Sequence, residues 1–170
     1  MYYCYTESPI GNLLIAGSRS TLKKIIFPKG KMARDPSPEW IEDAKYFKNV
    51  LDQLRAYFNG KLKVFDLQLS AEGTTFQKNV WDALKKIPYG ETFSYGEIAA
   101  LIGSPKASRA VGAANGQNPI PIVIPCHRVI GKSGDLTGFG GGLDTKIKLL
   151  SLEQEVISPQ TSFSFQTSAL

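Results

Sequence analysis

Cys126 and His127 are adjacent in a segment that contains several prolines, and such a pair can carry out nucleophilic chemistry. A cysteine attacks only as the thiolate, and at an ordinary pKa of about 8.5 it needs a base or positive surroundings. Neighbouring residues of an extended chain point to opposite sides, so we expect the imidazole to act through a bridging water. The structural alternative is a buried, inert cysteine beside a chance histidine.

A carboxylate should orient the imidazole, as in other relays of nucleophile, base and acid. Glu153, near the end of a predicted helix, is our candidate, with Asp135 and Asp144 as competitors. The chain has only two cysteines and one histidine, which excludes a disulfide scaffold and argues against a zinc site of the Cys/His kind.

The composition of the 170 residues is that of an ordinary globular protein, with 42% hydrophobic and 21% charged residues. No apolar run approaches the ~20 residues of a membrane span, and the N-terminus lacks a basic stretch followed by an apolar one. We therefore expect no membrane association and a cytoplasmic location. The net charge of +5 leans moderately toward polyanionic partners.

The elements that support this pair begin with an α/β unit. Strands are predicted at 2–7, 12–17, 23–28 and 64–70, where β-branched and aromatic residues lie between turn signals. An apolar helical face recurs from Trp40 to Phe58, and the helix is predicted to start at Ser37-Pro38 and to stop at Gly60. Six basic and no acidic residues between positions 19 and 34 indicate a solvated strand edge.

Helices and irregular loops follow from about residue 73. Capping boxes are predicted for Thr74 with Gln77 and for Ser94 with Glu97. Ser104 is the predicted N-cap of a third helix, with Pro105 at its first position.

The two short helices around residues 94–116 have the spacing of a helix-turn-helix, although a purely structural hairpin shows the same pattern. The second helix is rich in alanine and glycine around one long cation, Arg109. Its small residues could fit a groove or pack against a neighbouring helix. A glycine-rich loop at 134–142, a helix at 144–156 and an uncharged, disordered tail at 158–170 complete the prediction.

The motif IPCHRVI at 124–130, preceded by RAVGAANGQNPIPIV at 109–123, resembles the active-site signature of the O6-alkylguanine-DNA alkyltransferases. Residues 76–99 and 137–153 are similar to the segments that flank this signature in the family, and residues 1–17 match more loosely. The resemblance covers almost all of residues 74–153.

The resemblance implies an N-terminal α/β support domain at 1–72, a ribonuclease-H-like roll with a small antiparallel sheet and one helix. It also implies a mostly helical C-terminal domain at 73–157 with a helix-turn-helix and an active-site loop. The implied function is direct-reversal DNA repair: one irreversible transfer of an alkyl group from O6 of guanine, less efficiently from O4 of thymine, to Cys126. Double-stranded DNA containing O6-alkylguanine is the partner, the base is flipped into the site, no cofactor or metal is needed, and the chain acts as a monomer.

Residue roles follow from the same resemblance. His127 deprotonates Cys126 through a water, Glu153 holds His127, and Asn118 braces the active-site turn. The phenol of Tyr95 donates to guanine N3. The carbonyls of Cys126 and Val129 accept from the exocyclic amine, and the amide of Gly140 points at the alkylated oxygen.

DNA contacts are implied for a second set of residues. Arg109 fills the gap that the flipped base leaves, Gly112 and Ala113 let the helix enter the minor groove, and Ser104 and Lys132 reach phosphates.

The chain departs from mammalian members at Gly140, where they have serine, and at Phe139, where they have tyrosine.

Two other functions fit the motifs less well. One is a helix-turn-helix protein that binds alkylated bases without repairing them. The other is a Cys-His hydrolase that uses the glycine-rich loop as an oxyanion hole.

Overall fold

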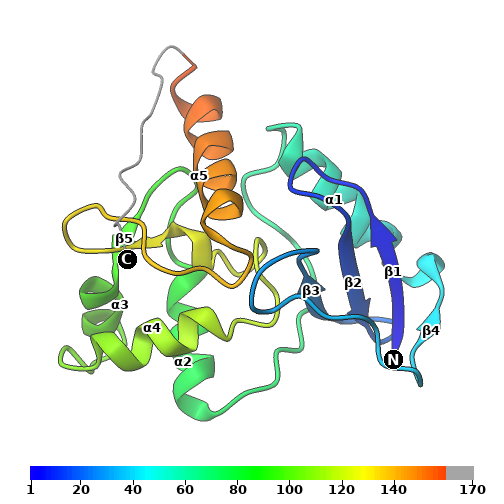
Figure 1. Ribbon diagram of the computed structural model, residues 1–170, viewed down its shortest axis with the longest axis horizontal. Coiled ribbons are helices and arrows are strands. Elements are labelled where there is room, and N and C mark those ends of the chain that lie inside the picture. The colour runs from blue at the N-terminus through cyan, green and yellow to red at the C-terminus, as the bar shows by residue number, and fades with distance from the viewer. Residues whose placement is uncertain (160–170) are drawn as a thin grey trace.

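The structure, a computed structural model, describes residues 1–159 (Figure 1). A sheet with helix α1 forms one side of the molecule, helices α2 to α4 form the other, and α5 stands above α2 and α4 in this view. The predicted disordered tail at 158–170 lies outside the described residues apart from its first two positions. Within the described part, no helix is long and apolar enough to cross a membrane.

Four strands form the N-terminal sheet in the order β3-β2-β1-β4. They are β1 (Tyr2–Thr6), β2 (Leu13–Gly17), β3 (Leu22–Ile26) and β4 (Ile41–Glu42). The pairs β1–β2 and β2–β3 are antiparallel, whereas β4 runs parallel to β1. The predicted small antiparallel sheet is confirmed for β1 to β3, and β4, which was not predicted, adds a parallel edge.

Strand β2 is buried along its whole length because both faces of the sheet are covered. Leu13 and Ile15 belong to the main core, which continues under the C-terminal helices. Leu14 lies on the opposite face in a smaller cluster, against which Tyr3 and Trp40 pack. The periodicity that placed Trp40 in a helix is thus wrong, since its ring covers the outer face of the sheet.

The first helix begins later than predicted. A 3-10 turn, η1 (Ala44–Phe47), leads into α1 (Lys48–Phe58), and the carboxylate of Asp43 accepts from the amide of Lys45 at its start. Upstream, the amide of Ile41 donates to the carbonyl of Met1 over 2.9 Å, so pairing with β1 prevails over the helical pattern. The predicted stop is confirmed: Gly60 follows the helix with a left-handed φ of 70°.

The predicted strand at 64–70 does not form. Only Leu69 makes an isolated bridge, to Leu22, and the flanking Gln68 and Ser70 complete two backbone hydrogen bonds along the β3 edge. Phe65, Leu67 and Leu69 still pack on the core, whereas Val64 is exposed.

The C-terminal unit comprises four helices, a 3-10 turn and two short strands. These are α2 (Thr75–Leu84), β5 (Phe93–Ser94), α3 (Tyr95–Leu101), α4 (Ser108–Gly116), η2 (Cys126–Arg128), β6 (Val129–Ile130) and α5 (Leu143–Ile157). Both predicted capping boxes are confirmed, at Thr74 and at Ser94. The parallel pair β5–β6 places the start of α3 directly beside the segment that carries Cys126.

The predicted start of α4 is wrong. Helix α4 begins at Ser108 with Ala107 as its N-cap, and Ser104 instead opens a separate turn in which its carbonyl accepts from the amide of Ala107. The left-handed Gly103 ends the preceding helix, and the tight turn after it uses Pro105 before α4 starts. Ser104 therefore has no helix N-terminus behind it.

Candidate active site

The proline-containing segment between α4 and η2 is held in shape by Asn118. Its side-chain amide donates to the carbonyl of Ile124 over 2.7 Å, and its oxygen accepts from the amide of Ile120 over 3.0 Å. Between them Ile122 is buried with a φ of 75°, a region that a β-branched residue rarely adopts. Core packing and the two Asn118 bonds hold this strained turn, which fixes the backbone that leads into the cysteine.

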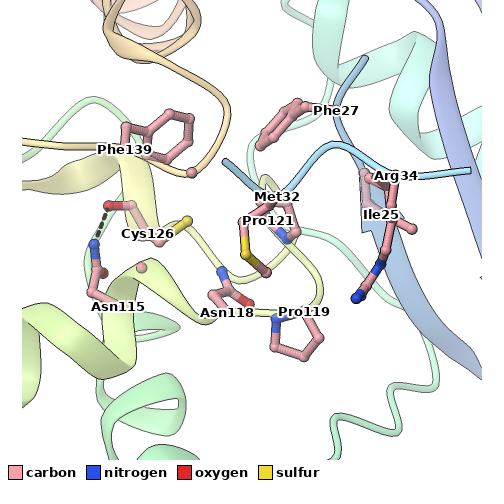
Figure 2. A pocket seen from close by; sticks show the side chains of 13 residues that line it. Ile25, Phe27, Met32, Arg34, Asn115, Asn118, Pro119, Pro121, Cys126 and Phe139 are labelled. Carbon is pink, nitrogen blue, oxygen red and sulfur yellow. Dashed lines mark hydrogen bonds between the residues drawn. The ribbon is translucent and has the colours of Figure 1, made fainter. Parts of the chain in front are cut away.

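Cys126 starts η2 and forms no disulfide. Its side chain is almost fully buried, and burial raises the pKa of the thiol to about 11, against the opposing effects of the Asn118 side chain and the Lys146 charge. Figure 2 shows the sulfur pointing into a small cavity lined by Met32 and Pro121. At neutral pH this thiol is almost entirely protonated, so it needs a base to react.

The only histidine is placed to be that base. His127 is fully buried, and its Nε2 lies 2.7 Å from Oε1 of Glu153. An ionised carboxylate only accepts hydrogen bonds, so Nε2 carries the proton and donates it. The other ring nitrogen, Nδ1, is buried and has no hydrogen-bond partner among residues 1–159. The ring thus presents an unused lone pair within one residue of the thiol.

Glu153 is the centre of a buried network rather than the partner of one histidine. Its carboxylate also accepts from Nε of Arg128 at 2.9 Å, from the hydroxyl of Tyr57 at 2.7 Å and from the amide of Gly90 at 3.0 Å. Burial alone would raise the pKa of Glu153, but the hydrogen bonds from His127 and Arg128 and the charge of Arg128 prevail and hold it well below its ordinary value. The carboxylate therefore stays ionised across the neutral range.

Burial lowers the pKa of His127 below its ordinary value, and the hydrogen bond to Glu153 only partly opposes this. The nearby cation of Arg128 acts in the same direction as burial. The imidazole is consequently neutral at pH 7 and free to take a proton. The competing acids lie elsewhere: Asp144 is exposed in the first turn of α5, and Asp135 accepts from the hydroxyl of Ser133.

Sequence reasoning missed Lys146, which is also fully buried. Its Nζ donates to the carbonyl of Val129 over 2.6 Å and more weakly to that of Thr137 over 3.4 Å. Burial lowers its pKa to about 8, while interaction with Cys126 opposes this. No carboxylate among residues 1–159 forms a salt bridge with it, and a lysine buried in this way is costly and points to a function.

A signal for Lys146 was present in the sequence. It lies seven residues before Glu153, two turns earlier on the same inward face of the predicted helix. Tyr57 and Arg128 were missed as well, and no local pattern could have found Tyr57, because its contact joins helices 96 positions apart.

Tyr95 and the glycine-rich loop form a further part of the site. The Tyr95 hydroxyl is 2.9 Å from Oγ1 of Thr137, and burial raises the pKa of the phenol, which keeps it a proton donor. The ring packs over Gly112 of α4, where a Cβ would lie 3.7 Å from it. The carbonyl of Val129 accepts from Lys146 but has a second lone pair for another donor.

Gly140 lines the cavity beside Cys126, whereas the residues predicted to contact DNA lie on the outer surface. One face of α4 is buried through Val111, Ala114 and Asn115, and the opposite face exposes Arg109 and Ala113. Exposed Lys132 lies in the loop after β6, and partly buried Ser104 in the turn before α4. Among the residues that the structure describes, no group of three or more His, Cys, Asp or Glu side chains could hold a metal ion.

Comparisons with known proteins agree with this arrangement. Residues 1–71 match the family described as the ribonuclease-like domain of 6-O-methylguanine DNA methyltransferase, and residues 75–155 match its DNA-binding domain. A methylated-DNA–protein-cysteine methyltransferase of Methanosarcina acetivorans is 58% identical over 153 residues, which cover 90% of this chain and 98% of that protein.

The protein of the same description from Mycobacterium tuberculosis is 52% identical over 155 residues, covering 91% and 93% of the two chains. A crystal structure of M. tuberculosis OGT in complex with DNA superposes with a TM-score of 0.86 at 51% identity, and covers 92% of this chain and 94% of that one.

Proposed function

Because the chain belongs to the 6-O-methylguanine DNA methyltransferase family, we propose that it repairs DNA by moving an alkyl group from O6 of guanine to its own Cys126. O4 of thymine is a poorer donor. The observation that carries the proposal is the buried thiol beside a neutral histidine whose Nδ1 is unused and whose Nε2 is held by Glu153.

The reaction proceeds once the alkylated base has left the stack, because its reacting oxygen is unreachable inside a duplex. The thiol of Cys126 gives its proton through a water to Nδ1 of His127, and Glu153 stabilises the imidazolium that forms. The thiolate then attacks the alkyl carbon. The new sulfur–carbon bond forms as the carbon–oxygen bond breaks.

The electron pair of the broken bond stays on guanine, which takes a proton at N3 from the phenol of Tyr95. The proton on His127 returns through solvent to the phenolate. The products are guanine and a thioether on Cys126, and a thioether has no reductive route back to a thiol. Each chain therefore acts once, without a cofactor.

Lys146 adds a positive charge next to the reacting centre and favours the thiolate over the thiol. Asn118 keeps the turn before Cys126 in shape. The carbonyls of Cys126 and Val129 accept from the exocyclic amine of guanine, and the amide of Gly140 faces the alkylated oxygen.

DNA contacts belong to the other face of the C-terminal unit. Helices α3 and α4 act as a helix-turn-helix, with the small residues Gly112 and Ala113 facing the minor groove and Arg109 filling the place of the flipped base. Lys132 contacts a phosphate, and Ser104 does so from its turn without the help of a helix dipole.

The proposal extends to the organisation of the chain and to where it acts. Residues 1–72 form a ribonuclease-H-like support unit and residues 73–157 the unit for DNA binding and alkyl transfer. The protein works as a monomer in the cytoplasm.

The test is the mass of the intact protein after incubation with duplex DNA that carries one O6-methylguanine. We expect a gain of one methylene equivalent, mapped to Cys126 and saturating at one group per chain, and none in Cys126→Ala. An unchanged mass with lesion-selective binding would identify a reader without repair activity. An unchanged mass without binding would reject both DNA functions.

A further inference from the structure

A small cavity borders the reactive sulfur, and both units of the molecule line it (Figure 2). The volume accessible to the centre of a water molecule is about 20 Å³, which is roughly enough for one water molecule. The C-terminal unit contributes Cys126, Pro121 and Phe139, and the N-terminal unit contributes Phe27 and Met32. Most of the lining residues are apolar, and Arg34, Asn115 and Asn118 add polar groups to the wall.

The N-terminal wall comes from the end of β3 and from the segment that follows it, residues 27–34, which lies directly on the glycine-rich loop. The amide of Met32 donates to the carbonyl of Gly140 over 3.3 Å, and the rings of Phe27 and Phe139 pack with centroids 5.6 Å apart. Gly30 has a φ of 92°, and a Cβ there would lie 2.2 Å from the Gly140 carbonyl oxygen. No other residue could occupy this position without moving the segment off the loop.

Met32 fills the space beside Gly140. A Cβ on Gly140 would lie 2.9 Å from Cγ of Met32, so the methionine takes up room that a side chain at position 140 would use. Met32 itself is only partly buried and sits in a surface segment, where a flexible thioether can change rotamer at little cost.

We propose that Met32 sets the size of the alkyl group that Cys126 accepts, an inference that rests on the proposed function. In the attack the alkyl carbon lies about 3–3.5 Å from the sulfur, so the rest of the group must occupy space next to the sulfur. The cavity beside Cys126 holds a methyl group as it stands. A benzyl ring enters only when Met32 swings out.

The experiment compares second-order rates of alkyl transfer from two duplexes of the same sequence, one with O6-methylguanine and one with O6-benzylguanine. Transfer is read from the intact mass of the protein. In Met32→Ala, which removes the thioether, we expect the benzyl-to-methyl rate ratio to rise by about 10- to 100-fold, the range by which apolar pockets discriminate group size. Met32→Phe should lower the same ratio.

Lys31→Ala is the matched control, because this neighbour is exposed and does not line the cavity. Its ratio should equal that of the unmodified protein. Methyl transfer with an unchanged ratio in both Met32 variants would overturn the role of Met32 and leave the proposed function intact. Absence of methyl transfer from the unmodified protein would overturn the proposed function and this inference together.

Discussion

Replacing His127 by glutamine separates the basicity of the imidazole from its structural role. A glutamine amide can still donate to Glu153, as Nε2 of His127 does over 2.7 Å, so the buried network keeps its donor. The variant loses only a group that can take a proton from the Cys126 thiol. We expect it to fold and to bind DNA but to transfer alkyl groups slowly.

The size of the effect follows from the thiol. With a pKa of about 11, Cys126 is a thiolate in roughly one chain in 10,000 at pH 7, and making the anion costs about 5 kcal/mol. A positioned general base typically accelerates such a reaction by ~10²- to 10⁴-fold. We therefore expect the rate of methyl transfer in His127→Gln to fall by about 10²- to 10⁴-fold at pH 7.

The pH profile gives the sharper test. The rate of the variant should rise about tenfold per pH unit above pH 6, because only hydroxide in solution then generates the thiolate. The rate of the unmodified protein should be nearly flat from pH 6.5 to 7.5, where His127 is largely neutral and Lys146, with a pKa of about 8, is still mostly charged.

The assay is a quenched time course with a labelled O6-methylguanine duplex, and Lys148→Gln, on the exposed face of α5, is the control. A His127→Gln rate within threefold of the control and flat with pH would refute the reasoning, since another group would then make the thiolate.

Three further predictions use other members of the site. Glu153→Gln should lower the free energy of unfolding in urea by about 3–5 kcal/mol, because it leaves the buried charge of Arg128 uncompensated. The control Glu155→Gln, at an exposed position, should change it by less than ~0.5 kcal/mol. Both His127 and Glu153 have lower pKa values in the folded protein than in the unfolded chain, so the folded state binds fewer protons. The free energy of unfolding in urea should therefore be constant near pH 7 and decline from about pH 6.5 down to pH 4. Lys146→Met should slow methyl transfer about tenfold, because loss of the positive charge raises the pKa of the Cys126 thiol. The same change should raise the melting temperature, because a buried ammonium no longer has to be desolvated. An unchanged rate would exclude an electrostatic role for Lys146.

The parts of the fold that depend on residues close together in the sequence could be predicted. Both capping boxes need only a polar side chain and a partner three residues later, and both form as expected. The prediction failed where tertiary pairing competes with local preference. The segment around Ile41 follows a helical pattern but finds a partner strand in β1, whose edge is otherwise unpaired.

The candidate site shows the same division. Residue types indicated the Cys126–His127 pair and left three candidate acids, among which Glu153 was preferred; the structure brings His127 and Glu153 into contact. The contact of Tyr57 could not be predicted, because it depends on how α1 meets α5 across the core. Lys146 was overlooked for a different reason: a lysine in an amphipathic helix is normally solvated, and only its place on the inward face indicated otherwise.

The Glu153 carboxylate explains why the N-terminal unit matters to the chemistry. One of its partners, Tyr57, comes from α1 of that unit, and the others come from the segment before β5 and from η2. The Tyr57 hydroxyl shares Oε1 of Glu153 with Nε2 of His127 and with Nη2 of Arg128, which donates over 3.0 Å. Removing the phenol would take one of these donors from the oxygen that also holds the imidazole. The N-terminal unit contributes no reacting atom, yet it orients the base through Tyr57 and lines the cavity beside the sulfur through Met32. In the proposed mechanism both units therefore contribute to the site, and the contact of Tyr57 in α1 with Glu153 in α5 sets the geometry of proton transfer.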